Sequence, residues 1–156
     1  MSTSPTRPTT EALSRYAEGF NESSALRYFG ARLSFPEGTR VRVEVTVRPE
    51  QRGGLGSALA VNGGVLAAIF DLAIGVTPAL VDPSKRTATM QLSMNFERPC
   101  LGEVIVAEAW IDRAGKNTLF SSALIRDAHG EVCARAQGLC KISRVPWAGG
   151  DSPAVN

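Results

Sequence analysis

One acidic residue stands out because of its place in the sequence. Asp71 is the only ionisable residue in the apolar run VNGGVLAAIFDLAIGV, residues 61–76. If this run is a helix, its neighbours three and four positions away include the small residues Ala67, Ala68 and Gly75, which leave space beside the carboxylate. An unpaired buried carboxylate typically costs several kcal/mol or acquires a raised pKa. We therefore interpret Asp71 as a candidate functional carboxylate. The alternative is a structural carboxylate held by backbone N–H groups or by an arginine.

The start of the same run could bind an oxyanion. Asn62 is a favourable N-cap residue for a helix. Gly63 and Gly64 follow it and leave backbone N–H groups uncovered at the positive end of the helix dipole. Such N–H groups bind anions and polarised carbonyl oxygens. An ordinary cap with two glycines for close packing is compatible with the same residues.

The apolar run is expected to be the central helix of a globular domain. It is apolar on nearly every side, which predicts burial on all sides, in a protein core or in a membrane. It is shorter than the about 20 apolar residues that a bilayer requires, so a protein core is favoured. Before it, residues 11–20 predict a short helix, residues 26–33 a first extended segment, and residues 39–47 an alternating, half-buried strand.

Four further strands are predicted after the helix, over residues 87–96, 103–112, 117–126 and 132–143. The turns between them are short, so they are expected to form antiparallel hairpins. The first of these strands alternates strictly, with Ala88, Met90, Leu92, Met94 and Phe96 on one face and Thr87, Thr89, Gln91, Ser93 and Asn95 on the other. The polar face is expected to meet solvent or a wet subunit interface. Together these elements predict an α+β fold, an antiparallel sheet of five or six strands wrapped around one long central helix.

Length and composition restrict the remaining possibilities. The 156 residues suit one domain, expected over residues 11–143 between a disordered tail, residues 1–10, and a loose tail, residues 144–156. A net charge of +2 without a basic run argues against nucleic acid. Three cysteines without CxxC spacing and the single His129 provide neither a disulfide framework nor a metal site. No signal peptide is recognisable, so a cytoplasmic protein without membrane association is expected.

The order of these features resembles a known family. A strand and a loop precede the motif NGG, which opens a helix with Asp71 seven residues after its second glycine. The next strand ends in NFERP, residues 95–99, and three hairpin-linked strands follow. Over roughly residues 25–143 this pattern resembles the hotdog-fold acyl-CoA thioesterases of the phenylacetate-pathway (PaaI) type. That family usually carries His-Gly-Gly, an acidic residue at this spacing, and an aromatic-x-Arg-Pro after the next strand.

The resemblance implies roles for particular residues. Asp71 would act as general base or nucleophile, and the N–H of Gly63 or Gly64 would polarise the thioester carbonyl. In the family these two groups come from different subunits, which implies a homodimer or a tetramer built as a dimer of dimers. Thr89 corresponds to a hydroxyl residue that helps to place the attacking water. From the residues alone, Thr89 could equally be a strand-forming residue on an exposed face.

The resemblance also implies a substrate. The expected substrate is the acyl-CoA thioester of a small aromatic or medium-chain acid, so that coenzyme A is part of the substrate and no separate cofactor is expected. Arg113 and Lys116 fall where such proteins often contact the phosphates of coenzyme A. From the residues alone, both could simply belong to a solvated turn.

The sequence departs from the family pattern in two places. Asn62 stands where the family usually has histidine, and Gly56 stands where it often has Asn or Gln, with Gln51 and Ser57 nearby but out of step. The loss of the motif histidine favours a second hypothesis, a non-catalytic protein that binds acyl-CoA or a lipid-like ligand. A third hypothesis is a scaffold module without a small ligand. Release of free thiol from acyl-CoA would separate the first hypothesis from the other two.

Overall fold

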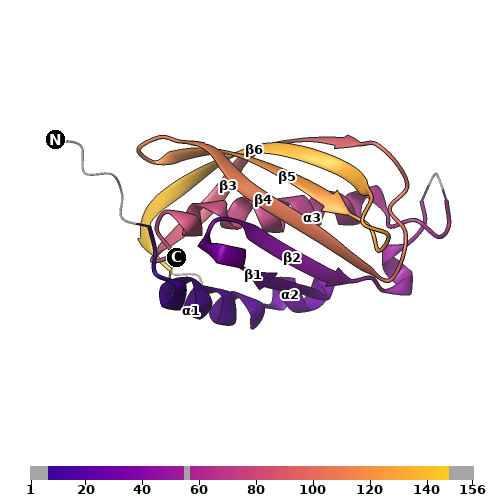
Figure 1. Ribbon diagram of the computed structural model, residues 1–156, viewed down its shortest axis with the longest axis horizontal. Helices are drawn as coiled ribbons and strands as arrows, with labels where there is room; N and C mark the ends of the chain where they lie inside the picture. Colours follow the sequence, from indigo (N-terminus) through magenta and orange to yellow (C-terminus); the bar gives the residue numbers. More distant parts are fainter. Residues whose placement is uncertain (1–6, 55–56, 148–156) are drawn as a thin grey trace.

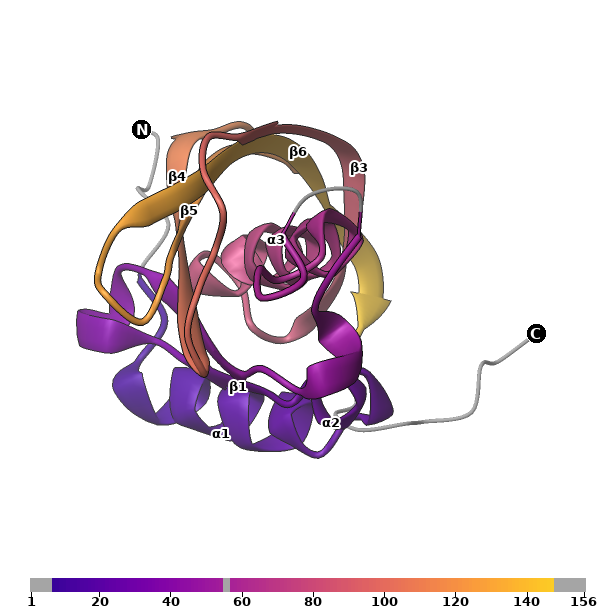
Figure 2. The same cartoon turned by 90° about the vertical axis from the view of Figure 1, so that its right-hand side faces the viewer.

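The structure, a computed structural model, describes residues 7–54 and 57–147. A six-stranded antiparallel sheet curls around the central helix α3 (Gly63–Val76), as Figure 1 shows from the side and Figure 2 along the helix. The sheet order is β1-β2-β4-β5-β6-β3. The strands are β1 (Ala31–Ser34), β2 (Val41–Thr46), β3 (Lys85–Phe96), β4 (Val104–Ala114), β5 (Thr118–Arg126) and β6 (Val132–Pro146). The predicted fold class, a curled sheet around one long helix, is confirmed.

The connections between strands follow the sequence prediction only in part. Strands β4, β5 and β6 form consecutive hairpins as expected. Strand β3 instead pairs with β6 at the sheet edge, so the chain crosses from that edge to the middle of the sheet before β4 begins. Strand β6 also continues to Pro146, which pairs with Lys85, so the predicted limit at residue 143 falls short. Of the predicted tails, residues 1–10 and 144–156, the parts at 1–6 and 148–156 lie outside the described residues, while residues 144–146 belong to β6 and Thr10 begins the first helix.

Helix α3 is covered on one side only. Ile69, Phe70, Ala73 and Ile74 are fully buried against the sheet. A stripe on the other side that includes Gly64 and Asp71 is exposed or half-buried. The prediction of burial on all sides is therefore wrong for the single chain, because a sheet curling over one side of a helix leaves the other side open. Residues 63–80, which include α3 and the 3-10 turn η3 (Thr77–Leu80), would suffice by length and composition to cross a membrane, and half of that stretch is buried within this fold.

A β-bulge in strand β3 changes which side chains face the helix. Thr89 pairs with Cys140 and Gln91 pairs with Leu139, so Met90 has no opposite residue. Beyond the bulge, Leu92 pairs with Gly138 and shares the inner side with Thr89. The predicted strict alternation, which put these two residues on opposite faces, is therefore wrong, because one extra residue reverses the order of faces.

The segment after the first helix is also different from the prediction. Residues 26–33 were expected to be extended, but a second helix, α2 (Ser24–Phe29), precedes the short strand β1. The Ser23 side chain caps this helix by accepting the Leu26 N–H, and Gly30 ends it in the left-handed conformation at φ 66°. Serine before a helix and glycine after it are standard end signals, but six residues are too few to show a helical period.

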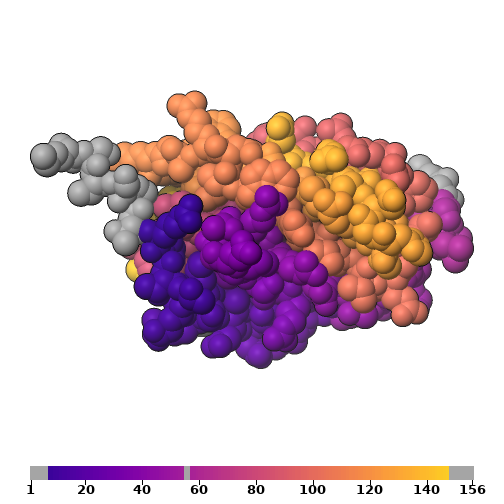
Figure 3. All heavy atoms as spheres, viewed as in Figure 1, coloured from indigo at the N-terminus to yellow at the C-terminus, as the bar shows by residue number. Residues whose placement is uncertain are grey.

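Helix α1 (Thr10–Asn21) packs beside strand β1, below the sheet in Figure 2, and its indigo atoms lie at the lower left in Figure 3. Thr9 caps it by accepting the Ala12 N–H at 3.1 Å. Leu13, Tyr16 and Ala17 are its buried residues. Tyr16 is the centre of an aromatic cluster with Phe20, Phe35 and Trp147, the last of which follows β6. Helix α1 therefore closes the part of the core that the sheet leaves uncovered at this end.

Candidate active site

The amino-terminal end of α3 carries an uncommitted backbone donor. The Asn62 side-chain oxygen accepts the Gly64 N–H at 2.8 Å, and its amide nitrogen donates to the Gly53 carbonyl at 2.9 Å. The predicted cap is therefore confirmed, and it occupies the Gly64 donor. Among the described residues, no acceptor is bonded to the N–H of Gly63, which is exposed. Of the two glycines, Gly63 is the one that can donate to an oxyanion.

A cavity of about 370 Å³ lies beside this donor. Gly63 and Asn62 line one side of it, and Phe96, Arg98 and Cys100 line the other. A Cβ atom at Gly63 would lie 3.9 Å from the Phe96 ring, so the aromatic residue of the NFERP motif reaches the start of α3. Arg98 is bound by Glu131 at 2.9 Å. The two motifs on which the resemblance depends, far apart in the sequence, thus meet in one place.

Asp71 lies in a different environment from the one expected. It is exposed in the single chain, so the expected burial, and the argument from its cost, is wrong here. The structural alternative is not met either, because in the described part of the chain its carboxylate makes no hydrogen bond and no ion pair. It lines a cavity of about 430 Å³ together with Gly75, Arg86, Thr87 and Thr89. A free carboxylate beside a cavity is available to act on a bound molecule.

Thr89 reaches the same cavity because of the bulge and because of Gly75. The Thr87 hydroxyl donates to the Gly75 carbonyl at 2.6 Å, which holds β3 close to the helix. A Cβ atom at Gly75 would lie 2.9 Å from the Thr89 hydroxyl oxygen, so only glycine fits at that distance without a shift. Gly75 is one helical turn after Asp71, and the structure therefore brings Thr89 and Asp71 to one cavity. Thr89 is half-buried, so the alternative of a strand-forming residue on an exposed face is not met.

A buried thiol lies beneath these residues. Burial raises the pKa of the Cys140 thiol, and the negative charge of Asp71 adds to this effect, while hydrogen bonds with Thr77 and Thr89 oppose it. The neutral thiol donates to the Ile74 carbonyl at 3.3 Å. Cys100 and Cys133 are buried as well, as the sequence suggested for small apolar residues. Within the described ranges, no group of three or more His, Cys, Asp or Glu residues could hold a metal ion.

The two cavities do not form one site within a single chain. They share no lining residue among those that the structure describes. Gly63 and Asp71 are eight positions apart on one helix, which corresponds to about 12 Å along its axis at roughly 1.5 Å per residue. A reacting carbonyl must lie about 3 Å from both the oxyanion donor and the catalytic base. The chain therefore carries two half-sites.

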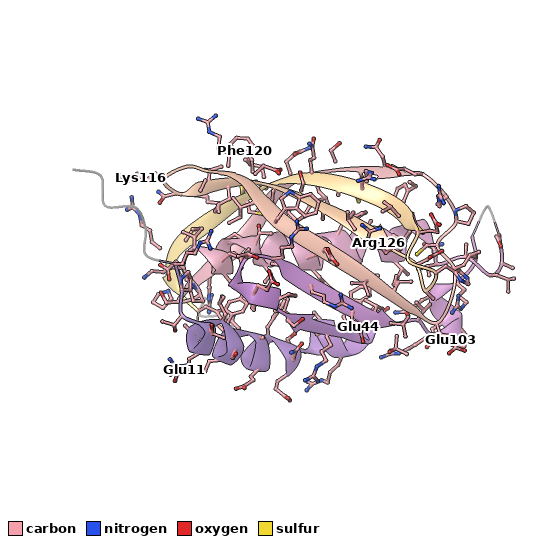
Figure 4. The ribbon with its side chains drawn as sticks, viewed as in Figure 1. Glu11, Glu44, Glu103, Lys116, Phe120 and Arg126 are labelled. Carbon is pink, nitrogen blue, oxygen red and sulfur yellow. The ribbon has the colours of Figure 1, made fainter. Side chains whose placement is uncertain are left out.

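Other residues considered in the sequence lie elsewhere. Arg113 and Lys116 are exposed near the turn between β4 and β5, and Lys116 projects from one end of the sheet in Figure 4. Neither residue lines the two cavities, so their contact with coenzyme A stays a prediction. Gln51 is buried and structural, since its side chain accepts the Arg48 N–H at 2.8 Å and donates to the Phe29 carbonyl at 3.1 Å. Gly56 lies outside the described residues.

Several residues that line the Asp71 cavity were not predicted as site residues from the sequence. Arg86 lies at the start of β3, Tyr16 on α1, and Trp147 just after β6. No short-range signal links these positions to residue 71, because three separate elements bring them there.

The six-stranded sheet that curls around the central helix α3 defines a hotdog fold. Residues 60–134 match the model of the thioesterase superfamily, in agreement with the resemblance seen in the sequence. No curated protein matches the chain in sequence.

Solved structures support the same fold. The PaaI protein from the phenylacetic acid degradation operon of E. coli is 18% identical with a TM-score of 0.75, over 89% of this chain and 99% of that one. A protein from Shewanella oneidensis related to the thioesterase superfamily is 20% identical with a TM-score of 0.74, over 85% of this chain and 96% of that one. A thioesterase from Haemophilus influenzae is 18% identical with a TM-score of 0.72, over 89% of this chain and 93% of that one. At these identities the likeness concerns the fold.

Proposed function

We propose that the protein hydrolyses the thioester bond of acyl-CoA, with a small aromatic or medium-chain acyl group. The observation that carries this proposal is the pair of uncommitted groups on α3, the free carboxylate of Asp71 beside a cavity and the unbonded N–H of Gly63. The match of residues 60–134 to the thioesterase superfamily model supports the same reaction. Coenzyme A enters as part of the substrate, and Arg113 and Lys116 are proposed contacts for its phosphates.

In the proposed reaction, the Gly63 N–H donates to the thioester carbonyl oxygen and stabilises the negative charge that develops there. Asp71 removes a proton from a water molecule that the Thr89 hydroxyl helps to place, and the water oxygen attacks the carbonyl carbon. The carbon–sulfur bond then breaks, the acid is released, and the thiolate of coenzyme A takes the proton. If Asp71 instead attacks the carbonyl carbon directly, coenzyme A leaves first, and water then hydrolyses the mixed anhydride to the same products.

A complete site requires two copies of the chain in this proposal. Gly63 of one copy and Asp71 of the other would face one thioester, because the two groups of a single chain are too far apart. The open stripe of α3 and the unpaired edge of β3 are the surfaces proposed for this homodimer. The exposed Met90 and Phe120, with Phe120 projecting outward from the sheet in Figure 4, offer a second contact for a dimer of dimers.

The test is a panel of aryl and straight-chain acyl-CoA substrates, with free thiol measured as it is released. We expect turnover by the wild type and its loss in Asp71→Asn and Asp71→Ala, both of which should fold because the carboxylate makes no internal bond. Glu18→Gln is the matched control, since Glu18 is an exposed carboxylate on α1 that lines neither half-site. Turnover by Asp71→Ala at the wild-type rate would refute the mechanism.

A non-catalytic acyl-CoA binder is the second candidate, and one observation favours it. Both polar atoms of the Asn62 side chain are bonded to the backbone, so this residue cannot move a proton as the family's usual histidine could. Tight acyl-CoA binding without thiol release would support the binder. Neither binding nor release would indicate a scaffold module.

A further inference from the structure

Two aromatic residues form a wall between the Asp71 cavity and a second hollow. The second hollow, of about 520 Å³, lies between α1 and the turn before β3, where Arg15, Gly19 and Ser84 line it. Tyr16 and Trp147 line both the Asp71 cavity and this hollow. Their ring centroids are 4.3 Å apart and the ring planes meet at 33°. The pair therefore stands where the two spaces would otherwise join.

The two halves of this wall are held differently. Tyr16 is only 6% exposed and packs against Phe20 and Phe35, with ring centroids 6.1 Å and 5.9 Å away. Trp147 is anchored through its backbone, whose N–H donates to the Ser84 carbonyl at 2.8 Å, and its indole is half-buried against the core. Tyr16 is thus fixed by the core, whereas the half-buried indole contacts Tyr16 and is partly exposed.

The cavity has both polar and apolar lining. Asp71, Arg86, Thr87 and Thr89 supply the polar groups, and Phe20, Leu72 and Val76 supply apolar side chains besides the rings of Tyr16 and Trp147. A thioester held at Asp71 would therefore direct its hydrocarbon tail toward the aromatic pair. The tail would end there, because the contacting rings of Tyr16 and Trp147 separate the cavity from the hollow beyond.

We propose that Tyr16 and Trp147 form the stop that sets the maximum length of the acyl group. This inference rests on the proposed thioesterase function and adds the residues that decide which acyl groups fit. Acyl chains that reach the stop gain from each buried methylene group, whereas longer chains must displace the indole and lose that gain.

The test compares kcat/KM over straight-chain acyl-CoAs that lengthen by two carbons at a time. Trp147→Ala joins the two spaces, so its best substrate should be longer than that of the wild type, with a gain of about fourfold for each further methylene group buried. Trp147→Phe keeps an aromatic wall and should keep the wild-type length preference. Phe35→Ala is the matched control, since Phe35 contacts Tyr16 but lines neither space.

Two results would overturn the stop. One is an active Trp147→Ala variant with the wild-type length profile, and the other is the same shift in Phe35→Ala. If no acyl-CoA is hydrolysed, the proposed function fails while the stop can still be tested, because non-hydrolysable thioether analogues of the same lengths can be titrated by calorimetry. The affinity optimum should then move to longer chains in Trp147→Ala, and an affinity that does not depend on chain length in either protein would refute the stop.

Discussion

Replacement of Asn62 tests how the oxyanion end of the site is built. In Asn62→Ala, the Gly64 N–H loses its acceptor and the Gly53 carbonyl loses its donor. Loss of a helix N-cap typically costs about 1 kcal/mol, and loss of one further hydrogen bond costs about 1 kcal/mol. The free energy of unfolding should therefore fall by about 2 kcal/mol. In a chain of this size this corresponds to a decrease of about 4 to 8 °C in Tm.

The same replacement should also lower activity. Without the side-chain bond to Gly64, the first turn of α3 is no longer fixed relative to the loop at Gly53, and the Gly63 N–H loses its fixed direction. We expect kcat to decrease about tenfold, which corresponds to about 1.4 kcal/mol of transition-state stabilisation. Asn62→Asp keeps the acceptor for Gly64 but not the donor for Gly53, so it should lose about half as much stability as Asn62→Ala.

Urea denaturation followed by tryptophan fluorescence gives the free energy of unfolding, and thiol release from acyl-CoA gives kcat. Asn95→Ala is the control, because the Asn95 side chain is exposed on β3 and makes no hydrogen bond in the described residues. If Asn62→Ala unfolds within about 0.5 kcal/mol of the wild type, a value typical of surface substitutions, the two bonds do not hold this loop. Unchanged kcat together with lowered stability would show that the cap does not position the oxyanion donor.

Three further predictions concern the Asp71 cavity. Gly75→Ala should not gain the about 1 kcal/mol that alanine usually adds to a helix, because the new Cβ displaces Thr89, and urea denaturation would measure this. Thr89→Val keeps the shape of the side chain but not its hydroxyl, so kcat should fall while Thr89→Ser stays close to the wild type in the thiol assay. Burial raises the pKa of Tyr16 from 10.0 to about 12, so the folded state keeps the proton that the unfolded state loses. Stability should therefore decrease as pH rises between these two values, by up to about 1.4 kcal/mol per pH unit, and denaturation of Tyr16→Phe should show a smaller decrease.

Most of the fold could be predicted from periodicity. The alternation in β2, β4, β5 and β6 and the apolar run of α3 are strong signals, because each extends over many residues. Helix α2 was missed since a helix of six residues has less than two turns in which to show its period. The place of β3 at the edge, paired with β6, depends on how the sheet closes around the helix and has no local signal.

The site residues proposed from the sequence are those that lie close together in it. Asn62, Gly63 and Asp71 could be proposed because a cap, bare N–H groups and a lone carboxylate can be recognised on one helix. The predicted burial of Asp71 was wrong for the single chain. An apolar helix face can be covered by the same chain or by a second chain, and the sequence does not distinguish the two. The predicted strict alternation in β3 was wrong because of the bulge at Met90. This bulge depends on the pairing of β3 with β6, which the sequence of a single strand cannot indicate.

The open side of α3 connects the structure with the proposed mechanism. The Asp71 cavity is lined from both α3 and β3, so the uncovered helix stripe adjoins the unpaired strand edge. In a single chain, Asp71 is exposed to solvent and its charge costs little. A second copy that covered this side would remove water from the carboxylate, and the loss would have to be offset by a group of positive character. The uncommitted amino-terminal end of the partner's α3 has that character, because its first N–H groups lie at the positive end of the helix dipole. The same contact that would make Asp71 costly to bury would therefore supply the oxyanion donor that its chemistry needs.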